Sequence, residues 1–270
     1  MYNKGDDIVN TIVCIKQVPG TSKVEVDEKT GVLKRDGIDS KMNPYDLYAL
    51  ETAFRIKELI GGNTDVISMG PPQAMEVIKE AYSMGVDNGI LISDRKFAGA
   101  DVLATSYTIA QGIRNAGSYD LIICGKQTTD GDTAQVGPEI AEYLGIPHVA
   151  NVNKIVEIKD DCIILEMDMQ DATGLLEVRF PCLITVEKDI YEPRLPSYIK
   201  KKETKDREIK ILSLNDLDDK DENNYGLNGS PTQVERIFPP EVNLKHESIT
   251  GTSEKVSRDI LNKLKELKFI

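Results

Sequence analysis

The chain has 270 residues and a formal net charge of −12 at pH 7, which argues against a nucleic-acid-binding protein because such a protein needs a basic face. No apolar run reaches the length of about 18 residues that a membrane helix requires, so we expect no membrane insertion. The polar opening MYNKGDDIVN lacks the apolar segment of a secretory signal. We therefore expect a cytoplasmic protein, built as one α/β domain with an appendage or as two small domains.

The first half of the chain alternates apolar runs with helical patterns. The runs that we predict as strands are residues 11–15, 65–69, 90–92 and 121–124. The helical patterns are residues 44–60, 73–84, 100–115 and 135–144. Strands and helices that alternate with short loops predict a doubly wound, mostly parallel sheet with helices on both faces.

The helix predicted from residue 44 has a clear beginning. Asn43 is the expected N-cap, and Pro44 suits the first helical position. Glu51 and Arg55 stand four residues apart, so we expect them to pair on the solvent side of this helix.

The pattern changes after residue 145. Residues 149–158, 162–167 and 175–180 are strand-like and separated by turns, which predicts an antiparallel meander added to the sheet. Residues 183–186 form a last apolar strand, and a small hairpin is expected at residues 23–35.

The C-terminal part of the chain is more polar. Residues 215–231 are acidic without periodicity, and residues 252–267 carry a helical stripe. A tail of this kind with one helix cannot bury a core of its own. We therefore expect a domain of residues 1–190, and an arm of residues 191–270 that packs on it or on a partner subunit.

Four cysteines and two histidines give little support for a metal site. The cysteines are scattered without a C-x-x-C pair, each within or beside an apolar run, at Cys14, Cys124, Cys162 and Cys182. This pattern is typical of buried free thiols in a reducing compartment. Without a Cys/His spacing pattern we expect no zinc centre.

The loops after the predicted strands are the candidate site, because ligands of parallel sheets bind at the carboxyl ends of the strands. These loops are residues 16–19, 69–72, 93–100 and 125–133. The sequence has no G-x-G-x-x-G turn, Walker A loop or G-x-S-x-G elbow, so a standard NAD turn, a P-loop and a hydrolase nucleophile are not supported.

The loop from residue 125 is the richest in hydroxyl and glycine residues. A strand, a Gly/Thr/Asp loop and a helix aim backbone N–H groups at an anion, so these residues predict an anion-binding loop and leave the identity of the anion open. Gly131 permits a turn with positive φ. Asp130 and Asp132 would repel phosphate, so we expect them to form Asx-turns or to bind a ribose hydroxyl. An ordinary strand–loop–helix connection stays the alternative.

Several motifs in the same order resemble the β subunit of electron-transferring flavoproteins along nearly the whole chain. They are VCIKQVP (13–19), TGVLKRDG followed by MNPYD (30–46), MGPPQA (69–74), EAYSMGVD (80–87), FAGADVLATS (97–106), GKQTTDGDTAQVGPEIAEYLG (125–145) and EPRLPSYI (192–199). The resemblance implies a Rossmann-like fold of the adenine nucleotide alpha hydrolase-like type, with an extended C-terminal arm.

The resemblance also implies a crevice that holds an adenine nucleotide. The matching positions are Cys14, Asn43, Asp46, Met69, Gly70, Ala100, Asp101, Thr105, Gly125, Lys126, Gln127, Thr128, Thr129, Asp130, Gly131, Asp132, Thr133, Ala134, Gln135 and Val136. An electron carrier of this kind needs no catalytic acid or base, since the cofactor supplies the chemistry and the protein positions it. We therefore assign no catalytic residue.

Two kinds of partner follow from the resemblance. One is an α subunit that carries a flavin and that the C-terminal arm embraces in an obligate heterodimer. The other is an acyl-CoA or other flavin-dependent dehydrogenase, which docks on an exposed recognition loop at Leu195, Pro196 and Ile199.

The family divides on the nucleotide held by its β subunit. Simple electron carriers hold AMP as a structural ligand. The electron-bifurcating branch holds FAD, which NADH reduces and which sends electrons to ferredoxin or flavodoxin and to the α-bound flavin. The forms FAGADVLATS and DGDTAQVGP resemble the bifurcating branch, so we expect FAD. A non-bifurcating carrier with AMP and a non-redox nucleotide-binding module are the alternatives.

Overall fold

A computed structural model describes residues 8–20, 40–169, 171–235 and 247–270. The described residues belong to two compact units, one that ends at residue 235 and one that contains the C-terminal helix. The hairpin predicted at residues 23–35 lies outside the described residues. No helix among those described is both long and apolar enough to cross a membrane.

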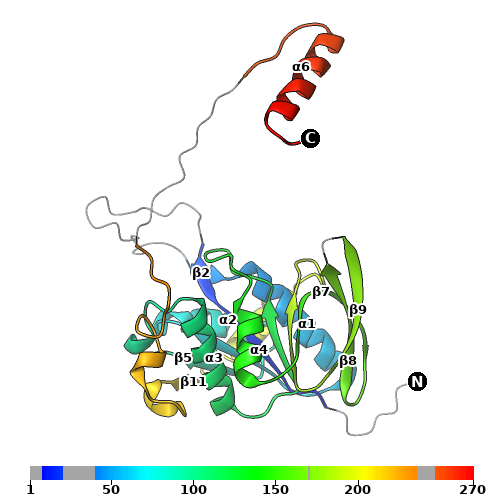
Figure 1. Ribbon diagram of the computed structural model, residues 1–270. Helices are drawn as coiled ribbons and strands as arrows, with labels where there is room; N and C mark the ends of the chain where they lie inside the picture. The colour runs from blue at the N-terminus through cyan, green and yellow to red at the C-terminus, as the bar shows by residue number, and fades with distance from the viewer. Residues whose placement is uncertain (1–7, 21–39, 170, 236–246) are drawn as a thin grey trace. The chain divides into compact units, whose positions relative to one another are not determined.

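The first unit is built on a nine-stranded sheet in the order β11-β5-β4-β1-β6-β10-β7-β8-β9 (Figure 1). Its strands are β1 (Thr11–Cys14), β4 (Thr64–Met69), β5 (Asn88–Ile92), β6 (Leu121–Gly125), β7 (His148–Ile158), β8 (Cys162–Met169), β9 (Ala172–Arg179), β10 (Cys182–Val186) and β11 (Ile209–Leu212). The six pairings from β11 to β7 are parallel. The pairings of β7 with β8 and of β8 with β9 are antiparallel, which confirms the predicted mixed sheet.

Helices cover both faces of the parallel strands, as predicted. The helices of one core are α1 (Pro44–Ile60) and α2 (Met75–Met84), and those of the other are α3 (Val102–Ala116) and α4 (Val136–Leu144). Neighbouring residues of β1 face opposite cores, Val13 towards α1 and α2 and Ile12 towards α3 and α4, and neither is exposed. A strand buried on both faces must be apolar throughout, which is why these strands are continuous apolar runs.

The order of connections creates a switch point beside β1. The chain passes from β1 through α1 to β4 and through α2 to β5, and then returns through α3 to β6 on the other side of β1. The loops after β1 and β6 therefore leave the same edge of the sheet in different directions. This is the position at which open α/β sheets bind ligands.

The apolar strand predicted at residues 183–186 is confirmed as β10, but its place within the sheet was not predicted. It lies between β6 and β7, parallel to both, and β11 follows it in the chain. A separate antiparallel pair, β2 (Gln17–Pro19) with β3 (Ser40–Met42), was not predicted either. Both results depend on pairing between distant segments, which the local pattern does not contain.

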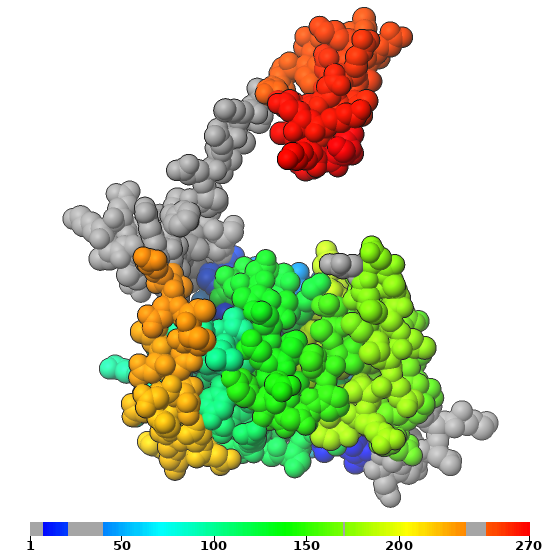
Figure 2. All heavy atoms as spheres, viewed as in Figure 1, coloured from blue at the N-terminus to red at the C-terminus, as the bar shows by residue number. Residues whose placement is uncertain are grey.

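The prediction of one helix beyond residue 191 is wrong. The segment contains a short helix α5 (Tyr198–Glu203) and strand β11, which pairs in parallel with β5. Leu212 and Tyr225 are buried in the core beneath α3. The space-filling view shows the yellow and orange residues that follow β11 along the flank of the α3 layer (Figure 2). Strand β11 has only its last residue fully buried, so no apolar run reveals it.

The second unit contains α6 (Ser253–Glu266), as predicted for residues 252–267. The hydroxyl of Thr252 accepts a hydrogen bond from the backbone N–H of Lys255 and so caps this helix. Its apolar stripe includes Ile260, Leu261 and Leu264, all exposed within the described residues.

Candidate functional site

Three neighbouring strands end at the candidate site. Cys14 at the end of β1 lies in register with Ile67 of β4 and with Cys124 of β6. Met69 and Gly125 therefore end the strands on either side of Cys14. The fold brings together these three residues of the predicted site at the switch point.

Asn43 connects the start of α1 with the loop after β6. Its side-chain amide donates to Oδ1 of Asp46, at 2.8 Å, and to the carbonyl of Gln127, at 2.9 Å. Its amide oxygen accepts from the backbone N–H of Thr129, at 3.2 Å. Asn43 occupies the N-cap position of α1, but its side chain makes no capping hydrogen bond. The capping role predicted for this side chain is wrong, because the amide oxygen that would cap the helix accepts from Thr129 in the loop after β6.

Asp46 fixes the end of β1 against the same helix. Its Oδ2 accepts a hydrogen bond from the backbone N–H of Lys16, at 2.7 Å, and the residue is only 4% exposed. Burial raises the pKa of Asp46 to about 7, against the hydrogen bonds from Asn43 and Lys16, which lower it. Both carboxylate oxygens of Asp46 accept from protein groups, and the predicted contact of Asp46 with a nucleotide stays a prediction.

Gly125 allows the loop to leave β6 close to α1. A Cβ atom at this position would lie 2.6 Å from Oδ1 of Asp46 and 2.7 Å from the backbone of Tyr45. A Cβ atom at Gly137, in the first turn of α4, would likewise lie 2.5 Å from Cγ2 of Thr185 in β10. Any side chain at either glycine would push apart elements that are packed together.

The two aspartates of the loop bond to side chains rather than forming the expected Asx-turns. Asp130 pairs with Lys16, whose ammonium lies 2.9 and 2.8 Å from its two carboxylate oxygens. Asp132 accepts a hydrogen bond from the side-chain amide of Gln127. Partial burial alone would raise the pKa of Asp130, but the hydrogen bond and charge of Lys16 lower it below the ordinary value. Lys16 offsets the charge that would otherwise repel an anion.

The backbone of the loop presents donors to solvent. Asp132 and Ala134 have positive φ angles of 54° and 57°, and Gln135 is right-handed helical. Residues of alternating handedness make a concave nest of N–H groups that binds anions. Within the described part of the chain, the N–H groups of residues 133–135 have no protein acceptor. Gly131 does not have a positive φ, so that prediction is wrong.

The loop thus fits a phosphorylated ligand. The nest stands directly before α4, whose N-terminus adds the favourable end of the helix dipole. Lys126, also predicted to bind the cofactor, donates to Glu187 at 2.5 Å, and its contact with a cofactor stays a prediction. Thr128 uses its hydroxyl to accept from the backbone N–H of Gly131, at 3.3 Å.

The predicted residues around the start of α3 contact the segment after β11. Asp101 caps α3 by accepting from the N–H of Ala104, and its other oxygen accepts from the N–H and hydroxyl of Thr232. Ala100 and Thr105 flank this cap and are half-buried. Burial alone would raise the pKa of Asp101, but these hydrogen bonds lower it. Its carboxylate therefore ties the segment after β11 to α3. Gly70 follows the last residue of β4, and its N–H donates to the carbonyl of Ile92 at 3.0 Å.

The thiols of Cys14 and Cys124 face each other at the sheet edge. Cys14 is half-buried and Cys124 buried, and both are free, as expected. A hydrogen bond with Cys14 and burial raise the pKa of Cys124. Both thiols pack beside the α3 and α4 core.

The predicted docking residues are exposed on the segment before and within α5. Leu195 is 86% exposed and Ile199 is 68% exposed, and Pro196 is exposed between them. Sequence reasoning placed Lys16 in a candidate loop and Arg194 in the motif of residues 192–199, but it assigned a role to neither side chain. The role of Lys16 could have been suspected from the sequence, because it is a cation that directly follows a buried strand and begins a candidate loop.

The comparisons with known proteins agree with this architecture. Residues 30–217 match the family model of the electron transfer flavoprotein domain. The chain is 44% identical to the electron transfer flavoprotein subunit beta of Clostridium acetobutylicum, over 97% of this chain and 100% of that protein. It is 44% identical to the caffeyl-CoA reductase-Etf complex subunit CarD of Acetobacterium woodii, over 94% of this chain and 97% of that protein. It is 38% identical to protein FixA of Azorhizobium caulinodans, over 94% of this chain and 92% of that protein. The chain therefore belongs to the electron transfer flavoprotein family, as a beta subunit.

Proposed function

We propose that the chain binds FAD at the switch point between β1 and β6 and forms part of an electron-bifurcating complex. In this proposal the complex oxidises NADH and sends electrons to ferredoxin or flavodoxin and, through the flavin of an α subunit, to a partner dehydrogenase. The observation that carries the binding step is the nest of N–H groups at residues 133–135, which suits the phosphates of a dinucleotide.

The residues of the chain bind and orient the cofactor. A bound flavin accepts electrons in pairs and releases them singly, which is the chemistry the site would gain. The nest and the N-terminus of α4 hold the phosphates, while Lys16 keeps Asp130 from repelling them. Asn43 holds the loop at Gln127 and Thr129, so the donors are already arranged before the nucleotide binds.

The partner dehydrogenase is proposed to be an enzyme that acts on acyl-CoA compounds. The support is the relative CarD, whose name places it in a complex with a caffeyl-CoA reductase. The exposed Leu195 and Ile199 give such an enzyme an apolar surface to bind.

Cofactor content tests the proposal. The chain is produced with its α subunit, the complex is denatured, and the released nucleotides are identified and counted. Two FAD per heterodimer are expected, with bleaching of the visible flavin absorbance on addition of NADH. One FAD with one AMP would overturn bifurcation and favour the simple carrier. A colourless complex would favour a non-redox nucleotide-binding module.

A further inference from the structure

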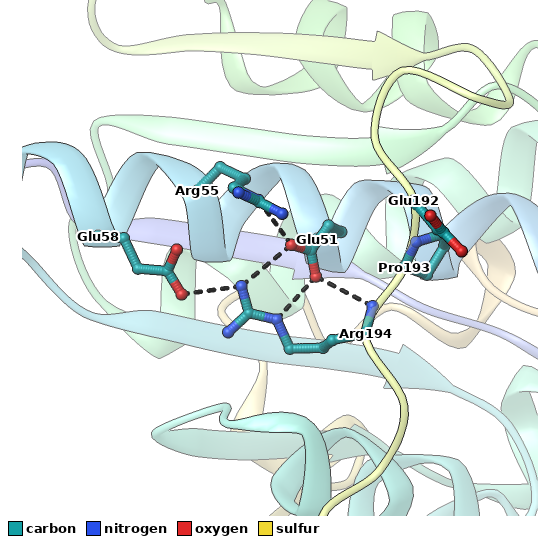
Figure 3. Close-up of a pocket in the computed structure, with 6 residues that line it drawn as sticks. All are labelled: Glu51, Arg55, Glu58, Glu192, Pro193 and Arg194. Carbon is teal, nitrogen blue, oxygen red and sulfur yellow. Dashed lines mark hydrogen bonds and ion pairs between the residues drawn. The ribbon is translucent and has the colours of Figure 1, made fainter.

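A cluster of charged side chains joins α1 to the segment that carries Leu195. Glu51 of α1 is only 1% exposed, although the sequence placed it on the solvent side of the helix. Its carboxylate accepts from Nε and Nη2 of Arg194, at 2.7 and 3.0 Å, and from the backbone N–H of Arg194, at 3.2 Å. Figure 3 shows Arg194 pointing along α1 between Glu51 and Glu58.

Further contacts hold the guanidinium of Arg194 in place, and together with the pair to Glu51 we call them the Arg194 anchor. Glu58 pairs with Nη2 of Arg194 at 2.8 Å, and the guanidinium lies 4.6 Å from the ring centroid of the buried Phe54. Arg55 donates to Glu51 from the same helix, at 2.8 Å. Burial alone would raise the pKa of Glu51, but the hydrogen bonds from Arg194 and Arg55 lower it. The carboxylate is therefore charged, and its charge is satisfied by two guanidinium groups.

A second anchor follows three residues later. The backbone N–H of Ser197 donates to the carbonyl of Ser83 at the end of α2, at 2.8 Å. Leu195 and Pro196 form the span between the two anchors. Because both ends of this span are bonded to helices, Leu195 is positioned although its side chain is 86% exposed.

We propose that Glu51 and Arg194 are positioning residues that hold Leu195 ready for the partner dehydrogenase. This inference rests on the proposed function, in which Leu195 and Ile199 dock the acyl-CoA dehydrogenase. A loop that is ordered before binding loses less conformational freedom on association. The bidentate pair supplies this order because the planar guanidinium fixes both the distance and the angle of the segment.

The test measures docking and cofactor chemistry separately. The α/β complex is reduced by NADH and used as electron donor for purified caffeyl-CoA reductase of Acetobacterium woodii, with caffeyl-CoA as acceptor. The concentration of the α/β complex is varied to give a KM and a kcat. Arg194→Gln is expected to raise KM about tenfold with kcat and NADH-dependent flavin bleaching unchanged, and Arg194→Lys to recover part of the loss.

A matched control distinguishes the anchor from a general loss of charge. Arg55→Gln removes the other guanidinium from Glu51 and leaves the contacts of Arg194 and Ser197 in place, so KM should stay within about twofold of the wild type. Amide hydrogen exchange at residues 194–197 should accelerate in Arg194→Gln and not in Arg55→Gln. Unchanged exchange in Arg194→Gln would overturn the anchor.

The variant Leu195→Ala distinguishes a failure of the positioning role of Arg194 from a failure of the proposed docking at Leu195. If Leu195→Ala raises KM and Arg194→Gln does not, docking stands and the positioning role is wrong. If Leu195→Ala leaves KM unchanged, or the wild type passes no electrons to the reductase, the proposed docking itself is wrong. A drop in flavin content or in the unfolding midpoint of Arg194→Gln would assign the pair a purely structural role.

Discussion

The ammonium group of Lys16, just after β1, lies 2.8 Å from a carboxylate oxygen of Asp130, in the loop after β6. The pair spans the switch point and joins the two strand ends between which the chain reverses its direction across the sheet. Because both side chains are partly exposed, the pair contributes about 0–1 kcal/mol to stability. Its importance is local: it sets the charge that an incoming phosphate meets.

Removing the charge of Lys16 should weaken nucleotide binding without unfolding the protein. In Lys16→Gln the carboxylate of Asp130 is no longer offset and repels the phosphates, so affinity should fall roughly 3- to 10-fold. The double variant Lys16→Gln with Asp130→Asn should recover most of this loss. Isothermal titration of the nucleotide-free α/β complex with FAD and with AMP measures the affinity of the single and the double variant. Equal losses in the single and double variants would show that repulsion by Asp130 is not the cause.

The backbone at Ala134 gives a test of the nest. Its φ of 57° is accessible to glycine and costly for a β-branched residue. Ala134→Val should change the loop and release the nucleotide of this subunit, whereas Ala134→Gly should keep it. Nucleotide content of the purified α/β complex measures the difference, with the flavin of the α subunit as internal reference. Retention of both nucleotides in Ala134→Val would contradict the assigned role of the nest.

The glycines of the loop should differ in their tolerance of a methyl group. Gly125→Ala would place Cβ 2.6 Å from Asp46 and 2.7 Å from Tyr45, which should destabilise the protein by about 1–3 kcal/mol. Gly131→Ala is the matched control, because its Cβ would meet only Thr128 Oγ1, at 3.3 Å, and φ is not positive. Urea unfolding of the two variants measures the contrast. Equal midpoints would show that the approach of α1 to β6 is not tight.

Asp46 should make stability depend on pH near neutrality. Its pKa is raised from 3.8 to about 7 in the folded protein. The unfolded state therefore loses its proton first, and stability contributed by protonated Asp46 is full below about pH 4 and is lost as pH rises to about 7. The expected slope is at most about 1.4 kcal/mol per pH unit.

Asp46→Asn removes this titration and serves as the reference. Unfolding midpoints of wild type and variant, measured in urea at pH 5, 6, 7 and 8, should show a difference that changes most between pH 5 and 7 and levels off above. A difference that is constant over this range would mean that the buried carboxyl titrates elsewhere. Asp130→Asn is a control whose titration lies lower, since the pKa of Asp130 is lowered.

Much of the first unit could be predicted because its strands are buried on both faces. Residues 121–124 have no polar side chain except the thiol of Cys124, and only a strand in the middle of a parallel sheet allows this. Two of the helices have local start signals, Pro44 at the first position of α1 and the capping side chain of Asp101 before α3. The loop from Gly125 was found in the same way, by its place after a buried strand.

The partners of the polar residues could not be predicted. Asn43 and Gln127, like Glu51 and Arg194, are far apart in the chain, and no local pattern indicates which of two possible acceptors a side chain will meet. The same is true of β10 and β11, whose positions in the sheet depend on which edges other segments have left open.

The sequence by itself therefore determined the layers of the fold and the loop that faces the ligand, since burial and backbone preference act over neighbouring residues. Only the tertiary structure decided that Lys16 offsets Asp130, that Asn43 holds the loop, and that Arg194 holds the segment of Leu195. These are contacts between groups separated by tens of residues or more. Their formation depends on the packing of the whole sheet, which brings the groups within hydrogen-bonding distance.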